Sequence, residues 1–83
     1  MDKEKIISLE ETLNKYLADE NINVTAEELT TDLAVLNKVT DAVIALICKI
    51  GVDENFCPNI HGVVLDGCLE TLNQIREEYM KNE

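Results

Sequence analysis

Apolar residues recur at steps of three and four positions near the start of the chain, which predicts an amphipathic helix over residues 2–20. At about 100° per residue these side chains fall within one arc, and most charged residues of the segment lie outside it. The apolar members of this face are Ile6, Leu9, Leu13, Tyr16 and Leu17. A polar connector over residues 20–23 follows the helix.

A second helix is predicted over residues 26–50, because a start signal and a stop signal bracket this segment. Thr25 followed three positions later by Glu28 has the pattern of a capping box, in which each side chain bonds the other residue's backbone amide. No helix breaker follows until Gly51, and glycine commonly ends helices at this position.

The helix over residues 26–50 carries two apolar stripes, so it needs a neighbour on each of two faces. The first stripe is formed by Leu29, Leu33, Leu36, Val43, Ile47 and Ile50. The second, rotated by about 100°, is formed by Val35, Val39, Ala42 and Leu46. We expect one stripe to meet the third helix and the other to meet either the first helix or another chain. Because there are two stripes, we predict a homodimer or higher oligomer, with the second stripe as its interface.

A third helix is predicted over residues 59–80, after a loop that ends in Pro58, a residue suited to the first turn of a helix. Gly62 is expected to mark a late start of this helix, and Gly67 to permit the close approach of a neighbour. The apolar stripe of the helix consists of Val64, Leu65, Cys68, Leu69, Leu72, Ile75 and Tyr79.

These elements predict an all-α fold, with residues 1–83 forming a single helical domain. Its main feature is a long antiparallel hairpin of residues 26–50 against 59–80. The shorter N-terminal helix completes a three-helix bundle, which we expect to be oligomeric.

The charge of the chain excludes some classes of partner. The 83 residues carry 17 acidic and 7 basic side chains, which gives a net charge of −10. Nucleic-acid binding needs a basic footprint, and an anionic membrane surface would repel this chain.

The longest apolar run, residues 42–48, is too short to span a membrane. Residues 1–5 mix both charges, unlike a signal peptide, so we expect a cytoplasmic protein.

One group of residues has the chemistry of a zinc or thiol site: Cys48, Cys57 and His61. The spacing of Cys57 and His61 suits zinc, but Cys68 is seven residues beyond His61, about 10 Å along one helix. An acidic loop residue, 53 or 54, would have to complete the set. Because cysteine also packs as a small apolar residue, we expect Cys68 to be part of the core and expect no metal or other cofactor.

Cys57 and His61 also raise the question of nucleophilic catalysis, which requires an orienting third group and a cleft. A bundle this small has little room for such a cleft, so we expect the chain not to be an enzyme.

The leading prediction is a small acidic helical interaction protein that binds a partner protein as a regulator or inhibitor. By analogy with other short helical hairpins, it would be a bacterial or phage accessory protein. The first alternative is a zinc- or thiol-dependent domain that uses Cys48, Cys57 and His61. The second alternative is an oligomer that sequesters a small ligand at a subunit interface. A phosphate-rich ligand would require Lys38, Lys49 and Arg76 to converge.

Overall fold

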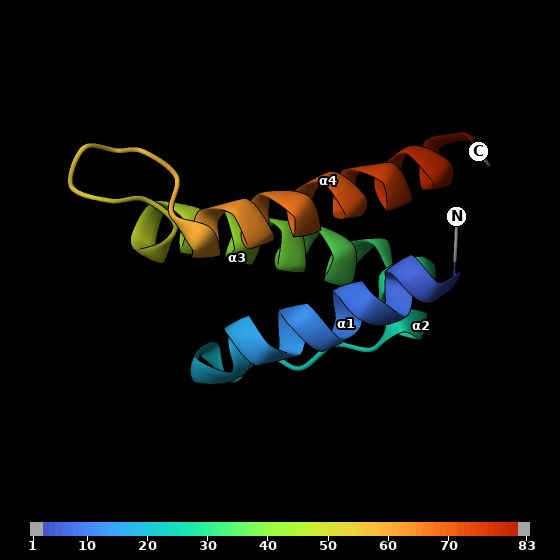
Figure 1. Cartoon of the computed structure of the whole chain (residues 1–83). Coiled ribbons are helices and arrows are strands. Elements are labelled where there is room, and N and C mark those ends of the chain that lie inside the picture. Colours follow the sequence, from blue (N-terminus) through green and yellow to red (C-terminus); the bar gives the residue numbers. More distant parts are fainter. Residues whose placement is uncertain (1–2, 82–83) are drawn as a thin grey trace.

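The computed structural model describes residues 3–81, and every regular element within them is a helix (Figure 1). In chain order the elements are α1 (Lys3–Leu17), the 3₁₀ helix η1 (Ala18–Glu20), α2 (Ala26–Thr31), α3 (Leu33–Ile50) and α4 (Ile60–Lys81). The predicted all-α class is therefore confirmed. Residue 2, where the first helix was predicted to start, lies outside the described residues.

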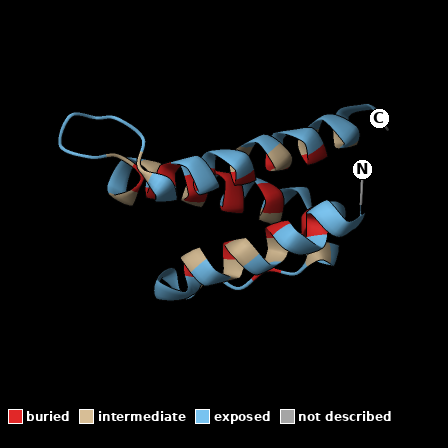
Figure 2. Cartoon of the chain, viewed as in Figure 1, coloured by how far each residue is buried: buried red, intermediate tan, exposed pale blue. Residues whose placement is uncertain are grey.

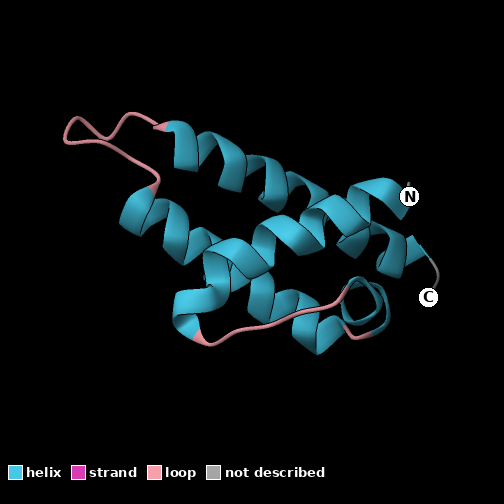
Figure 3. Cartoon of the chain, turned by 60° about the horizontal axis from the view of Figure 1, so that its bottom comes forward, coloured by secondary structure: helices cyan, strands magenta, loops and turns pink. Residues whose placement is uncertain are grey.

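The three long helices lie lengthwise beside one another (Figure 1). α1 and α3 run in the same direction and α4 runs antiparallel to both, so α3 and α4 form the predicted hairpin. After a left-handed turn at Asn21, residues 22–25 form an extended connector that leads the chain back from the end of η1 to α2 (Figure 3). α1 packs against α4 and α2, and α2 packs against α3. None of the helices within residues 3–81 combines the length and apolarity needed to cross a bilayer.

The prediction of one continuous helix over residues 26–50 is wrong, because the helix is interrupted at Asp32. This residue is extended, with φ −126° and ψ 103°. Its Oδ1 accepts hydrogen bonds from the amides of Ala34 (3.0 Å) and Val35 (3.3 Å), which caps the start of α3. Its own amide still donates to the Glu28 carbonyl at the end of α2. Aspartate is a preferred N-cap that stabilises a helix start by about 1 kcal/mol, which offsets part of the cost of the break.

The start of α2 has the predicted capping box. The Thr25 Oγ1 accepts from the Glu28 amide at 3.1 Å, and the Glu28 Oε1 accepts from the Thr25 amide at 3.2 Å. Just before this cap, the side chain of Asn14 on α1 forms hydrogen bonds with both backbone groups of Val24. The extended connector is therefore fastened to α1 immediately before α2 begins.

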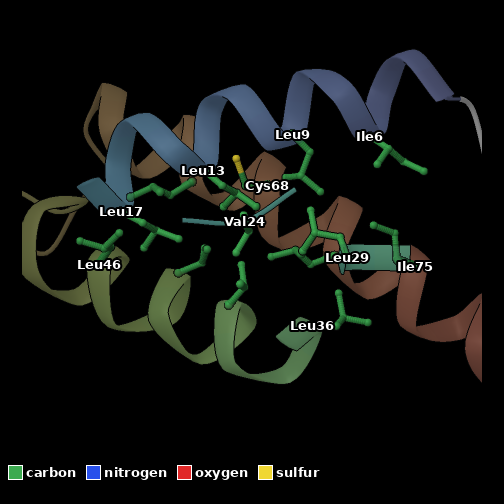
Figure 4. Packing of buried hydrophobic residues seen from close by; sticks show 14 residues of the cluster. Ile6, Leu9, Leu13, Leu17, Val24, Leu29, Leu36, Leu46, Cys68 and Ile75 are labelled. Atoms are coloured by element: carbon green, nitrogen blue, oxygen red, sulfur yellow. The ribbon is translucent and has the colours of Figure 1, made fainter. Parts of the chain in front are cut away.

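The core lies between the α3–α4 hairpin and the layer formed by α1, the connector and α2 (Figures 2 and 4). All four helices and the connector contribute buried apolar side chains to it. These are Ile6, Leu9, Leu13, Leu17, Val24, Leu29, Leu36, Val39, Val43, Leu46, Leu65, Cys68, Leu72 and Ile75.

The second apolar stripe of residues 26–50, which was predicted to form an interface, is covered within one chain. Val39 and Leu46 are buried, and Val35 and Ala42 are partly buried against the same core. Leu46 and Leu17 of α1 belong to the same buried cluster (Figure 4). The burial of this stripe therefore requires no second chain.

α3 and α4 meet through their backbones at Gly51 and Gly62. A Cβ atom on Gly62 would collide with the carbonyl oxygen of Gly51, and one on Gly51 would lie 3.0 Å from the Cα atom of Gly62. Next to this contact, the Asn59 Nδ2 donates to the Ile50 carbonyl at 2.7 Å, and the Asn59 Oδ1 accepts from the Gly62 amide at 2.9 Å. Asn59 thus closes α3 and caps α4 with one side chain.

The predicted roles of the two α4 glycines are therefore wrong. α4 begins at Ile60, so Gly62 marks no late start; it is Gly62 that makes the close approach. Gly67 faces open space, because a Cβ atom at this position would have no heavy atom of another element within 4 Å. Gly51 ends α3 without the left-handed conformation that helix-ending glycines often adopt, since its φ is −87°.

Candidate protein-binding surface

The loop between α3 and α4 projects beyond the ends of both helices and is hydrogen-bonded internally (Figures 1 and 3). At its base the Asn59 amide donates to the Gly51 carbonyl at 2.9 Å, and residues 52 and 58 form an isolated antiparallel bridge. Further out, the Asp53 amide donates to the Cys57 carbonyl at 2.9 Å. The backbone of the loop is therefore held by its own hydrogen bonds, and its tip has a defined conformation.

Asp53 organises this tip. Its Oδ1 accepts hydrogen bonds from the amides of Asn55 (2.8 Å) and Cys57 (3.0 Å), and its carbonyl accepts from the amide of Phe56 (3.0 Å). Aspartate commonly forms turns of this kind by bonding the backbone two residues onward. These bonds fix the backbone on both sides of Phe56, at the amides of Asn55 and Cys57.

Phe56 has a backbone conformation and an exposure that are both unusual for phenylalanine. Its φ is 61°, in the left-handed region, where non-glycine residues other than Asn and Asp are uncommon. Its side chain is 84% exposed, the highest value among the exposed large hydrophobic residues. Left-handed backbone costs an ordinary residue about 1–2 kcal/mol, and here no burial of the ring offsets that cost. Such an outlier motivates a functional hypothesis.

Exposed apolar side chains are concentrated next to Phe56. Of the eight large hydrophobic residues exposed within residues 3–81, four lie between positions 56 and 64. Ile60 is 75% exposed and Val63 is 64% exposed, one turn apart at the start of α4. We call Phe56, Ile60 and Val63 the apolar tip. Clusters of large exposed apolar side chains commonly mark protein-binding sites.

The outward face of α4 continues from Val63 as a row of carboxylates. Asp66, Glu70 and Glu77 follow at 3, 7 and 14 positions, which keeps them on the side of the helix that carries Val63. All three are exposed, and none forms an ion pair with any residue in 3–81. We call these three residues the acidic row. The apolar tip and the acidic row together are the candidate surface.

A shallow groove lies beside this surface, between α1 and α4. It encloses about 260 Å³, below the roughly 300 Å³ at which ligand pockets usually begin. Its walls are formed by Lys5, Ser8, Leu9 and Thr12 from α1 and by Val64, Gly67, Cys68 and Thr71 from α4. The groove is open along its length, so it offers little enclosure to a small molecule.

The structure does not gather the predicted zinc or thiol residues into one site. Cys48 and Cys57 are both exposed, on α3 and in the loop respectively. His61 bonds through its Nδ1 to the Tyr16 hydroxyl at 3.0 Å, with the two rings edge to face. Across residues 3–81, no group of three His, Cys, Asp or Glu side chains is placed to hold a metal ion. Cys68 is buried among apolar side chains, and this burial raises the pKa of its thiol.

Two of the three cations considered for a phosphate-rich ligand are bonded to other side chains. The Lys49 Nζ lies 3.9 Å from a Glu20 carboxylate oxygen, and the Arg76 guanidinium donates to the Asn37 Oδ1. Lys38 lies eleven residues before Lys49 on α3, about 16 Å away along the helix. The structure therefore gives no phosphate site formed by these three side chains.

Sequence reasoning missed Phe56 as a candidate functional residue. One signal was available: a lone phenylalanine in a loop rich in aspartate, asparagine and proline has no periodic partner that would place it in the core. The positive φ could not be read from the sequence, because it follows from the way Asp53 bonds the loop backbone.

Comparison with known proteins gave no match: no family model, no curated protein and no solved structure is significantly similar to this chain.

Proposed function

We propose that this chain is a non-enzymatic protein-binding module that acts on its partner as a regulator or inhibitor. The observation that carries the proposal is Phe56, an aromatic side chain that is 84% exposed and held in the left-handed region by a hydrogen-bonded loop. This arrangement costs the isolated chain free energy. A partner that buries the ring would offset that cost.

The apolar tip supports this function because its burial would contribute substantially to binding. Transfer of a fully exposed Phe, Ile or Val side chain out of water is favourable by about 1.5–3 kcal/mol. Phe56, Ile60 and Val63 are all exposed in the isolated chain. Aromatic residues are also enriched at the centres of protein interfaces, where a few side chains provide most of the binding energy.

The internal order of the loop supports the same function. Binding usually costs free energy to immobilise loops and side chains, and a preorganised loop reduces this cost. Here Asp53 bonds two amides near the tip, and Asn59 fastens the base to both helices. The backbone that carries Phe56 is thus held in place before any partner binds.

The test is capture of the partner by the full chain with and without the exposed ring. Tagged wild-type protein is expressed in its source cells, and captured proteins are quantified by mass spectrometry. We expect Phe56→Ser to lose the partner. Ile7→Ser, which removes a 46% exposed side chain from α1, serves as the matched control and should retain it.

With the purified partner, Phe56→Ser should weaken binding at least about tenfold, roughly 1.4 kcal/mol, while Ile7→Ser should change it less than about twofold. Circular dichroism and thermal unfolding should show that both variants remain folded, because both side chains are exposed. Equal capture by the wild type and Phe56→Ser would refute the proposal.

A further inference from the structure

We infer that the segment received by this surface is a cationic helix of the partner protein, with apolar side chains at one end and lysine or arginine side chains along the rest. This inference rests on the proposed function and adds the chemistry of the partner. The apolar tip would take the apolar side chains of that helix, and the acidic row would take its lysine or arginine side chains.

The charge around the surface has one sign over a long stretch. Between Lys49 and Arg76 the sequence contains no lysine or arginine, and it contains four carboxylates, at positions 53, 54, 66 and 70. This stretch includes the entire loop and most of α4. By contrast, exposed Ile7 lies on α1, whose fifteen residues include both lysines and glutamates. The loop and most of α4 therefore carry acidic residues without any lysine or arginine of their own.

The acidic row is available to a partner. Asp66, Glu70 and Glu77 are exposed, and within residues 3–81 none is neutralised by an ion pair. Their spacing matches that of side chains along one face of a second helix. From Ile60 to Glu77 the surface extends about 26 Å along α4, the length of a partner helix of about 17 residues.

The same features disfavour other occupants. A second copy of this chain docked face to face would bring its own acidic row against this one, and like charges in an interface are unfavourable. Nucleic acids and anionic membranes would meet the same repulsion. A cationic segment would instead be attracted, and the attraction would also accelerate its association at low salt.

The experiment uses three synthetic helical peptides of about 17 residues as probes, matched to the length of the surface at 1.5 Å per residue. The first has leucines in its first two turns and lysines on one face of the remaining turns, so that apolar and charged side chains follow one another as they do along the surface. The second replaces every lysine with glutamate, and the third keeps the lysines but replaces every leucine with serine. Binding to the full chain is measured by fluorescence anisotropy, and amide chemical shifts locate the contact. We expect the first peptide to bind at least about tenfold more tightly than either of the others.

Matched charge variants distinguish binding by the acidic row from attraction to the net negative charge of the chain. Asp66→Asn/Glu70→Gln and Glu11→Gln/Asp41→Asn each remove one aspartate and one glutamate from exposed positions, the latter pair on α1 and α3. We expect the first double variant to weaken binding of the leucine–lysine peptide at least about fivefold, and the second less than about twofold. Shift changes should be confined to residues 51–77.

Equal losses from the two double variants would show attraction to net charge alone and overturn the inference. Failure of the leucine–lysine peptide to bind at low salt would also overturn it, as would tighter binding of the glutamate peptide. The capture experiment with Phe56→Ser decides the proposed function separately. If that variant loses its partner while Asp66→Asn/Glu70→Gln binds it as well as the wild type, the function stands and the cationic partner is refuted.

Discussion

Asn14 and Val24 are joined by two hydrogen bonds that use both polar groups of one side chain. The Asn14 Oδ1 accepts from the Val24 amide, and the Asn14 Nδ2 donates to the Val24 carbonyl, each at 2.9 Å. Val24 is buried in the core and lies in an extended connector with no helical neighbours to satisfy its backbone. The amide side chain therefore takes the place that a neighbouring strand would have.

Replacement of Asn14 by alanine should destabilise the fold. Both backbone groups of Val24 would lose their partners in a partly buried position, at a cost of about 2 kcal/mol. Urea unfolding measures this difference. Asn23→Ala is the control, because Asn23 is exposed and should change the free energy of unfolding by less than about 0.5 kcal/mol. Equal losses of unfolding free energy in the two variants would mean that the two hydrogen bonds between Asn14 and Val24 do not stabilise the fold.

The two glycines of α4 should respond to alanine in opposite directions. Gly62→Ala places a methyl group against the Gly51 carbonyl, which forces α3 and α4 apart and should cost at least about 2 kcal/mol. Gly67→Ala fills open space in a helix interior and should stabilise the protein by about 1 kcal/mol. For a chain of this size that gain raises the Tm by roughly 4–8 °C. A loss of stability in Gly67→Ala would contradict the open surroundings of this residue.

The stability of the fold should fall at alkaline pH because of Cys68. Burial raises the pKa of this thiol above its ordinary value of 9.0. As pH rises past the ordinary value, the unfolded chain releases the proton first and is favoured. The contribution is therefore complete below about pH 8 and is lost as pH rises through the raised pKa. Burial, with a smaller contribution from Asp32, also raises the pKa of Tyr79, which adds a further loss at higher pH.

Urea unfolding from about pH 7.5 to about pH 9.5, a range that brackets the ordinary pKa of a thiol, measures this dependence. Cys68→Ala should reduce the fall of the unfolding free energy with rising pH, whatever its effect on stability at neutral pH. Cys57→Ala should leave this pH dependence unchanged because Cys57 is exposed. Identical pH profiles of the wild type and Cys68→Ala would remove Cys68 as the cause.

Leu46→Glu tests whether the second stripe of residues 26–50 belongs to the core or to an interface between chains. Leu46 is 7% exposed, so a carboxylate there should destabilise the single chain by more than about 3 kcal/mol and abolish its helical circular dichroism signal. Ile44→Glu is the control on the same helix; its side chain is 46% exposed, and this variant should remain folded.

The homodimer or higher oligomer stays a prediction, and sedimentation of the wild type measures its mass directly. A Leu46→Glu variant that is folded and lighter than the wild type would assign the stripe to a chain–chain interface. A change of mass in Ile44→Glu would instead place the interface on the outer face of α3.

Helices with periodic apolar faces and defined end signals were predictable from the sequence. Leu9, Leu13, Leu65 and Leu72 are buried as the spacing required, and Thr25 caps α2 as its pattern indicated. Periodicity reports which face of a helix is apolar, and that face is buried wherever the chain can fold onto it.

Features that depend on single polar side chains were not predictable in the same way. Asp32 lies within an apolar pattern that continues through it, so the pattern gave no sign of a break. Asn14 resembles any solvated residue of an amphipathic helix until the connector is placed beside it. The candidate surface was missed for a related reason: hydrophobic periodicity describes what is buried, whereas Phe56 matters because it is not.

The Asn59 clamp has a consequence for how the loop can change. The relative placement of α3 and α4 is set by Gly51, Asn59 and Gly62, which all lie at the base of the loop. The hydrogen bonds of residues 53–57 join only residues of this segment, so its sequence and length can vary while the hairpin keeps its alignment. The two helices would then keep their arrangement while the loop between them changes. Related chains could acquire new binding preferences in this way without substitutions in their core.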